Sequence, residues 1–181
     1  MVFNQVSVDG YFVDAKGDMS WAHKHDPEWL AFVEGNASGE GSMLFGRVTY
    51  EMMAGYWPSP SAAQNNPQVA ARMNSAEKMV VSNSLTNATW TNTRVIHGDP
   101  AEEVRKLKQE LGQDIVMFGS GRLVATLAEE GLIDEYQIVV NPIVLGSGRT
   151  MFEGVKKRVA LKLAKTRAFG NGNVVLWYER G

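Results

Sequence analysis

The chain has 181 residues, and its 18 Lys and Arg against 20 Asp and Glu leave a net charge of −2, with no basic field that would attract nucleic acid. This length fits a single domain with a core of its own, and the absence of cysteine excludes disulfides, thiolate metal sites and a cysteine nucleophile. No signal peptide is recognisable and no apolar stretch approaches the roughly 20 residues that span a bilayer, so we expect a cytoplasmic protein without a membrane partner.

Apolar runs between turn residues predict the elements of the first half of the chain. Asp26 is a typical N-cap, and Pro27 suits the first position of a helix that fades at Gly39. Residues 58–67 are rich in Pro, Ser, Asn and Ala, which indicates a loop. The other expected elements are strands at 2–8, 42–45 and 77–82, a short extended piece at 11–13, and helices at 47–54 and 68–76.

The second half continues the alternation of strands and helices. We expect strands at 93–96, 115–118 and 136–140, helices at 101–111 and 122–130, and a terminal hairpin of strands 161–168 and 174–179 around the turn at 169–173. Strands that alternate with helices predict an α/β fold with a mainly parallel central sheet covered on both faces. The hairpin adds antiparallel strands at one edge, and the whole chain reads as one domain, residues 1–181.

A glycine turn joins the strand at 115–118 to the next helix. Gly119, Ser120 and Gly121 follow a run of four apolar residues, and a helical pattern begins at Arg122. Such a junction offers free backbone N–H groups and the positive end of a helix dipole, and a phosphate can approach glycine backbone closely. The alternative is a tight strand-to-helix turn without a ligand.

A second signal of the same kind lies upstream. Gly46 ends a buried strand, and Arg47, Val48 and Thr49 open a helix. The guanidinium of Arg47 presents a planar donor fork that suits a phosphate, and the Thr49 hydroxyl can donate to a phosphate oxygen. The alternative is a surface arginine beside a helix cap. Ligands of such sheets bind at the carboxyl ends of the strands, where both glycine signals fall.

Two further positions invite a functional interpretation. Asp9 ends the first strand, where a carboxylate could orient a substrate or relay a proton; a turn aspartate bonded to local N–H groups is the alternative. His23 and His25 resemble a metal site, but no third ligand is obvious, and we expect no metal. Gly119-Ser120-Gly121 lacks the Gly-x-Ser-x-Gly pattern of a hydrolase elbow.

Six segments, taken together and in order, resemble the dihydrofolate reductase superfamily. They are 7–11 (SVDGY), 44–51 (LFGRVTYE), 78–82 (KMVVS), 116–123 (VMFGSGRL), 132–136 (LIDEY) and 141–148 (NPIVLGSG). The most similar branch is the reductase domain of the bifunctional riboflavin-biosynthesis deaminase-reductase. The resemblance implies a dihydrofolate-reductase-like three-layer fold and an NADPH-dependent reductase that acts on a small molecule, in which the cofactor supplies the hydride and the protein supplies geometry and electrostatics.

The resemblance also implies a set of site residues. Gly46, Arg47, Val48 and Thr49, with Val81 and Ser82, would hold the adenosine-side phosphates; Phe118, Gly119, Ser120, Gly121, Arg122 and Leu123 would cradle the pyrophosphate. Val8 and the catalytic Asp9 would lie near the nicotinamide, and Tyr11, Trp21 and Glu51 near the substrate. Pairing through the sheet edge in that branch implies a homodimer, which the terminal strands and the apolar segment 138–145 favour.

Departures from the family pattern narrow the range of substrates that we expect. Trp29 stands where dihydrofolate reductases carry the acid that binds the pterin, and Val124 stands where a tyrosine is usual. Both argue against dihydrofolate. The chain has no deaminase zinc signature, and basic residues near the first loop are sparse, chiefly Lys16 and Lys24. We expect a reductase of the 5-amino-6-(5-phosphoribosylamino)uracil type; the alternatives are a dihydrofolate reductase and a nucleotide-binding module without catalysis.

Overall fold

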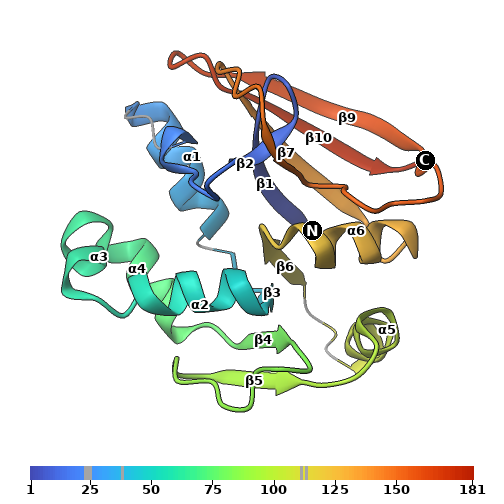
Figure 1. Cartoon of the computed structure of the whole chain (residues 1–181). Coiled ribbons are helices and arrows are strands. Elements are labelled where there is room, and N and C mark those ends of the chain that lie inside the picture. Colours follow the sequence, from blue (N-terminus) through green and yellow to red (C-terminus); the bar gives the residue numbers. More distant parts are fainter. Residues whose placement is uncertain (23–25, 38, 111, 113) are drawn as a thin grey trace. The chain divides into compact units, whose positions relative to one another are not determined.

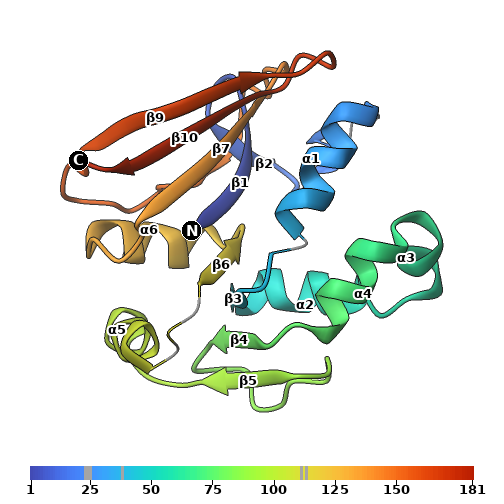
Figure 2. The ribbon, with the colours of Figure 1, turned by 180° about the vertical axis from the view of Figure 1, so that it is seen from behind.

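The computed structural model describes residues 1–22, 26–37, 39–110, 112 and 114–181. The chain divides into two compact units, one formed by residues 1–30 and 121–181 and the other by residues 31–120. Figures 1 and 2 show the ribbon from opposite sides. Helix α1 (Pro27–Ala37) starts in the first unit and ends in the second.

The unit of residues 31–120 contains a parallel sheet. Its strands lie in the order β5-β4-β3-β6, and every pairing between them is parallel. The strands are β3 (Ser42–Gly46), β4 (Lys78–Val81), β5 (Thr93–Ile96) and β6 (Ile115–Phe118). The helices that complete this unit are α2 (Arg47–Tyr56), α3 (Pro60–Asn65), α4 (Pro67–Ser75) and α5 (Pro100–Glu110).

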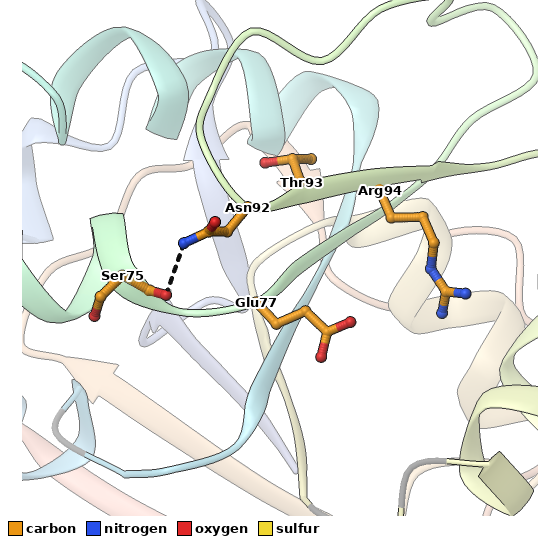
Figure 3. Close-up of a pocket in the computed structure, with 5 residues that line it drawn as sticks. All are labelled: Ser75, Glu77, Asn92, Thr93 and Arg94. Carbon is orange, nitrogen blue, oxygen red and sulfur yellow. Dashed lines mark hydrogen bonds between the residues drawn. The ribbon is translucent and has the colours of Figure 1, made fainter.

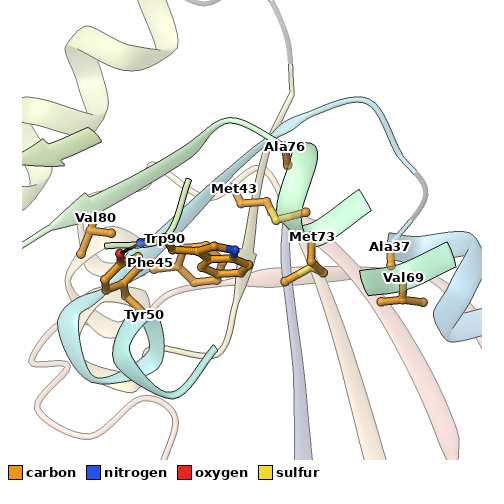
Figure 4. Packing of buried hydrophobic residues seen from close by; sticks show 9 residues of the cluster. All are labelled: Ala37, Met43, Phe45, Tyr50, Val69, Met73, Ala76, Val80 and Trp90. Atoms are coloured by element: carbon orange, nitrogen blue, oxygen red, sulfur yellow. Dashed lines mark hydrogen bonds between the residues drawn. The ribbon is translucent and has the colours of Figure 1, made fainter. Parts of the chain in front are cut away.

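Both faces of the two central strands, β3 and β4, are buried, as is typical of parallel strands. Met43 and Phe45 point to one face of β3 and Leu44 to the other, and all three are at most 2% exposed. Figure 4 shows the cluster on the first of these faces, where β3 and β4 meet α2, α4 and the indole of Trp90. Its members are Ala37, Met43, Phe45, Tyr50, Val69, Met73, Ala76, Val80 and Trp90. This packing fixes the carboxyl ends of β3 and β4.

The unit formed by residues 1–30 and 121–181 combines parallel and antiparallel pairing. β1 runs parallel to β7, and β10 runs antiparallel to β7 on one side and to β9 on the other. A separate two-stranded sheet pairs β2 with β8. The elements are β1 (Val2–Ser7), β2 (Tyr11–Asp14), the 3₁₀ turn η1 (Ser20–Ala22), α6 (Gly121–Glu129), β7 (Glu135–Asn141), β8 (Gly148–Thr150), β9 (Leu161–Ala168) and β10 (Val174–Arg180).

The expected mainly parallel sheet and antiparallel terminal hairpin are confirmed, but one local prediction was wrong and one strand was missed. The segment 58–67 is not a loop, because α3 forms inside it: Ser59 accepts the N–H of Ala62 at 3.2 Å and Pro60 occupies the first turn. Strand β8 was not predicted. Its three residues carry little pattern of their own and pair with β2.

Candidate cofactor and substrate sites

Several sequence-predicted phosphate ligands lie along one edge of the sheet in residues 31–120. Gly46 is the register partner of Val81, and Val81 is the partner of Ile96. The residues that come next, Arg47, Ser82 and His97, therefore follow three adjacent strand ends. On the other side of β3, β6 ends at Phe118 and leads directly into Gly119. The carboxyl edge of this sheet thus gathers backbone and side-chain donors from segments far apart in the chain.

The two glycine turns are joined by a hydrogen bond. Ser120 Oγ accepts the backbone N–H of Gly46 at 2.9 Å. Gly119 and Ser120 both adopt left-handed backbone conformations, with φ of 71° and 73°. This conformation is strained for a residue with a Cβ, and such strain concentrates at functional sites. A Cβ added to Gly119 would lie 3.7 Å from the Thr49 side chain, which places Thr49 against the same turn.

The start of α2 is suited to an anion. Gly46 is the N-cap and offers no side-chain acceptor, and the first turn contains no acidic residue. In α5, by contrast, Asp99 Oδ1 accepts the N–H groups of Ala101 and Glu102 at 2.9 and 3.0 Å. The first N–H groups of a helix have no partner within it, and the dipole is positive there. Arg47 adds a cation at this end of α2, which favours a negative ligand there.

Glu51 pairs with Arg47. Arg47 Nη1 donates to both carboxylate oxygens of Glu51 at 3.0 Å, one helical turn away. The two side chains are 44% and 47% exposed, and exposed pairs of this kind contribute about 0–1 kcal/mol. Glu51 was predicted to lie near the substrate, and its observed partner is the predicted phosphate-binding arginine. A phosphate can compete for the guanidinium at little cost.

Ser82 forms the turn that follows β4. Its Oγ accepts the N–H groups of Ser84 at 3.2 Å and Leu85 at 3.0 Å, so its hydroxyl proton can still be donated outward. Of its predicted companions, Val81 is 9% exposed and can offer a ligand chiefly its backbone, whereas Val48 is 61% exposed and can offer apolar surface.

Asp9 is clamped by backbone donors in the unit of residues 1–30 and 121–181. Its carboxylate accepts the N–H of Leu145 at 3.1 and 3.2 Å and that of Gly146 at 2.7 Å. The Ser7 hydroxyl contributes most to lowering the pKa of Asp9 to about 2, and the two N–H groups add to it against desolvation. The carboxylate is therefore ionised at neutral pH. It has no proton to give, and the geometry favours the orienting role over proton relay.

The surroundings of Asp9 are apolar and exposed. Val8 donates its N–H to the carbonyl of Ile143 at 2.9 Å, and the side chains of Val8 and Val144 are 62% and 69% exposed. Nearby along the chain, Tyr11 donates its N–H to Ser7 Oγ at 3.0 Å, and Trp21 Nε1 donates to the carbonyl of Asp18 at 3.2 Å. Local hydrogen bonds thus order the predicted substrate residues of this unit.

The start of α6 offers backbone rather than side chains. A Cβ on Gly121 would lie 2.9 Å from the ring of Phe12, so only glycine fits there. Leu123 is 7% exposed and belongs to the core, and the first turn carries no acidic residue. Of the three predicted residues here, Arg122 alone has an exposed side chain.

Trp29 is a core residue. It is 3% exposed, and its ring meets that of Phe169 edge-on with centroids 5.1 Å apart. Val124 is 0% exposed. Neither side chain can take the place of the groups that dihydrofolate reductases use at these positions, which agrees with the argument against dihydrofolate.

An open pocket lies at the amino ends of β4 and β5, opposite the carboxyl edge that carries Arg47 and Ser82. It is lined by Ser75, Glu77, Asn92, Thr93 and Arg94, at the amino ends of β4 and β5 (Figure 3). Asn92 Nδ2 donates to the carbonyl of Ser75 at 3.0 Å, which closes one side. None of the predicted site residues lines this pocket.

Metal and membrane features are absent from the part of the chain that the structure describes. No group of three His, Asp or Glu there could hold a metal ion, and His23, Lys24 and His25 lie outside those residues. No helix among the described residues is long and apolar enough to cross a membrane.

A family model for the RibD C-terminal domain matches residues 1–175. The chain belongs to this family. YyaP of Bacillus subtilis (strain 168) is 30% identical over 178 residues, 96% of this chain and 90% of YyaP. The crystal structure of a putative riboflavin biosynthesis protein from Shewanella sp. PV-4 is similar with a TM-score of 0.76 and 22% identity, covering 99% of this chain and 97% of that one.

A bifunctional relative shares the same fold. The crystal structure of a diaminohydroxyphosphoribosylaminopyrimidine deaminase/5-amino-6-(5-phosphoribosylamino)uracil reductase from Thermotoga maritima has a TM-score of 0.68 and 14% identity. The match covers 99% of this chain and 56% of the Thermotoga chain. These structural similarities confirm the dihydrofolate-reductase-like fold expected for the family.

Sequence reasoning missed one residue of the carboxyl edge. His97 follows β5 directly, in register with Arg47 and Ser82, and its Nδ1 lies 2.7 Å from the Ser82 carbonyl. A lone histidine after a short strand carries no motif. Its position at the carboxyl edge of the sheet becomes visible only when the order of β3, β4 and β5 is known.

Proposed function

We propose that this member of the RibD C-terminal domain family is an NADPH-dependent reductase. The observation that carries the proposal is the hydrogen bond from Gly46 N–H to Ser120 Oγ, which joins the two glycine turns into one anion-binding edge. The uncapped start of α2 and the cation of Arg47 fit a phosphate group at that edge. The adenosine-side phosphates would meet Arg47, Thr49 and Ser82, and the pyrophosphate would meet the backbone at 119–123.

NADPH, when bound, supplies the hydride, and the chain supplies binding and orientation. Asp9 holds the segment 145–146 through two backbone N–H groups and keeps a fixed negative charge at the end of β1. The exposed side chains of Val8 and Val144 flank it with apolar surface on which a flat ring can lie. Because the Asp9 carboxylate is ionised, its part is to position this segment, and the proton that follows the hydride has another source.

The substrate we propose is an aminouracil bearing a ribose phosphate or a close relative of it. Support comes from the family and from the Thermotoga maritima relative, whose name includes 5-amino-6-(5-phosphoribosylamino)uracil reductase. Burial of Trp29 in the core disfavours dihydrofolate as the alternative.

Turnover tests the proposal. The purified chain is mixed with NADPH and 5-amino-6-(5-phosphoribosylamino)uracil, and the absorbance of NADPH at about 340 nm is followed. We expect NADPH consumption that falls at least tenfold in Arg47→Ala, because loss of a charge-assisted contact of about 1.5–3 kcal/mol weakens cofactor binding. Binding of NADPH without consumption with this uracil or with dihydrofolate would instead identify a nucleotide-binding module.

A further inference from the structure

The imidazole of His97 is held in one orientation. Its Nδ1 lies 2.7 Å from the carbonyl oxygen of Ser82, and the side chain is on the surface. A carbonyl oxygen only accepts hydrogen bonds, so Nδ1 must carry the proton. Nε2, on the far side of the ring, is thereby left for another partner. A hydrogen bond at one ring nitrogen determines the tautomer of a histidine and thereby which partner the other nitrogen can bind.

By position, His97 belongs to the carboxyl edge of the sheet in residues 31–120, where the proposed phosphate ligands Arg47 and Ser82 also lie. Val81 pairs with Gly46 on one side and with Ile96 on the other, so Ser82 is flanked by Arg47 and His97. Neighbouring strands lie about 4.8 Å apart, which puts His97 one strand spacing from Ser82. The rim is closed beside it, since Asn83 Oδ1 accepts the Gly98 N–H at 2.8 Å and Asn83 Nδ2 donates to the Gly98 carbonyl at 3.3 Å.

The charged groups around His97 leave it free to meet an anion. Arg47, at the start of α2, follows the strand end two places along the edge from His97. Asp99, two residues after His97, is occupied by the N–H groups that open α5. Glu103, on the first turns of α5, pairs with Lys106 at 2.6 Å. Both carboxylates therefore have partners of their own, and neither is required by the imidazole.

We propose that His97 is a ligand of the phosphate on the adenosine ribose of NADPH, opposite Arg47 across Ser82. This inference rests on the proposed function. In the neutral ring Nε2 can only accept, so binding a phosphate oxygen requires a proton on Nε2 as well. With both ring nitrogens protonated, His97 contributes a charge-assisted hydrogen bond to the phosphate. It distinguishes a nucleotide with a 2′-phosphate from one without.

The matched variant is His97→Asn. The amide Nδ2 of asparagine can replace imidazole Nδ1 as donor to the Ser82 carbonyl, while the group at Nε2 is removed. Calorimetric titration with 2′,5′-ADP and with NADH measures the effect. We expect His97→Asn to bind 2′,5′-ADP about tenfold more weakly than the wild type, with NADH affinity nearly unchanged.

Two further variants keep the outcome interpretable. Asn83→Ala loosens the rim but retains the imidazole, and it is expected to bind like the wild type. His97→Arg places a cation at this position and is expected to bind 2′,5′-ADP about as well as the wild type. Equal affinity of the wild type and His97→Asn for 2′,5′-ADP would overturn the role of His97 and leave the proposed function standing. Equal losses of affinity in His97→Asn and Asn83→Ala would have the same meaning. Failure of the wild type to bind NADPH or 2′,5′-ADP at all would overturn the proposed function with it.

Discussion

Arg47 is the residue whose placement most needs a ligand to explain it. A cation in the first turn of a helix faces the positive end of the dipole, an arrangement unfavourable by about 0.3–1 kcal/mol. The side chain that pairs with it, Glu51, is half-exposed and lies one turn further along α2. A phosphate bound at Gly46 and Arg47 would reverse the sign of this interaction. The sequence alone already singled out Arg47, but its pairing with Glu51 required the structure.

Removing the charge of Glu51 is expected to strengthen cofactor binding. In Glu51→Gln the guanidinium loses its competing carboxylate and the site loses a negative charge near the phosphates. We expect the Kd for NADPH to fall about threefold to tenfold, on the scale of one charge interaction in high dielectric. Fluorescence titration of NADPH measures it.

Glu40→Gln is the matched control, because it removes the same charge from the amino end of β3, the end opposite Gly46. We expect its Kd to equal that of the wild type. Weaker NADPH binding by Glu51→Gln would contradict the competition and show that Glu51 orients Arg47 for the ligand.

Asp9 makes a pH-dependent contribution to stability. Its pKa in the folded chain is about 2 against an ordinary value of 3.8, so its stabilising effect is complete above pH 3.8 and is lost as the pH falls toward 2. The free-energy difference between wild type and Asp9→Asn in urea unfolding should therefore be constant from pH 7 to about 4 and shrink below it. A difference that grows on acidification would show that the clamp does not depend on the ionised carboxylate.

At the scale of elements, the carboxyl end of α4 is bound by a buried lysine at the start of β4. Lys78 is 0% exposed, and its Nζ donates to the carbonyls of Met73, Asn74 and Ala76 at 2.9, 3.1 and 2.7 Å. The ammonium also lies 4.5 Å from the centre of the Trp90 ring. These carbonyls include the last ones of the helix, which otherwise lack partners. Lys78 therefore ties the end of α4 to β4, next to Trp90 of the hydrophobic cluster.

Lys78→Met is expected to lower the free energy of unfolding by about 2–4 kcal/mol, because buried carbonyls lose their donor. Burial, and secondarily Arg72, lowers the pKa of Lys78 from 10.5 to about 8. The unfolded chain thus binds more protons between pH 8 and 10.5, and the wild type gains stability from this residue as pH rises through that range.

Urea unfolding at several pH values compares wild type, Lys78→Met and the surface control Lys16→Met. We expect the gap between wild type and Lys78→Met to widen from pH 8 to 10, and Lys16→Met to follow the wild type. A gap that narrows over this range would contradict the burial argument.

Most elements were predictable because their apolar patterns are strong, as in Ile115–Phe118 and the helix that follows. The helix at Pro60–Asn65 was not, since its composition is typical of loops and its Ser59-Pro60 start was not recognised as a cap. The pairing of β2 with β8 depends on partners more than 130 residues apart, which local patterns do not reveal.

At the scale of the whole molecule, β9 leaves an edge that an isolated chain would expose. It ends its sheet in the strand order, and seven of its eight residues are exposed, with Leu163 at 50%. Open edges of this kind invite pairing with another chain. We propose that two copies associate through this edge.

Light scattering coupled to size exclusion should give about twice the chain mass of 19.9 kDa. Leu163→Lys should shift the population toward the single chain, because a buried charge at the edge is unfavourable, while Lys16→Met should not. A wild-type mass of one chain at all concentrations would contradict the dimer.

The function was accessible from sequence only in outline. Each glycine turn signalled a possible phosphate site, but Gly46 and Ser120 are 74 positions apart, and the hydrogen bond between them is a property of the folded sheet. The same holds for His97, which no motif marks. The sequence also favoured Asp9 as a functional residue, whereas its low pKa and its backbone partners came from the fold.

The most direct test of the central claim is a thermal-shift titration of the chain with NADPH, NADH and NADP⁺. A ligand at about 100 times its Kd stabilises the native state by about 2.7 kcal/mol, which for a chain of this size raises Tm by roughly 5–10 °C. We expect that rise with NADPH for the wild type and for the control Arg158→Ala, and its near loss in Arg47→Ala. A folded wild type whose Tm responds to none of the three nucleotides would contradict the reductase assignment and leave the glycine turns as architecture alone.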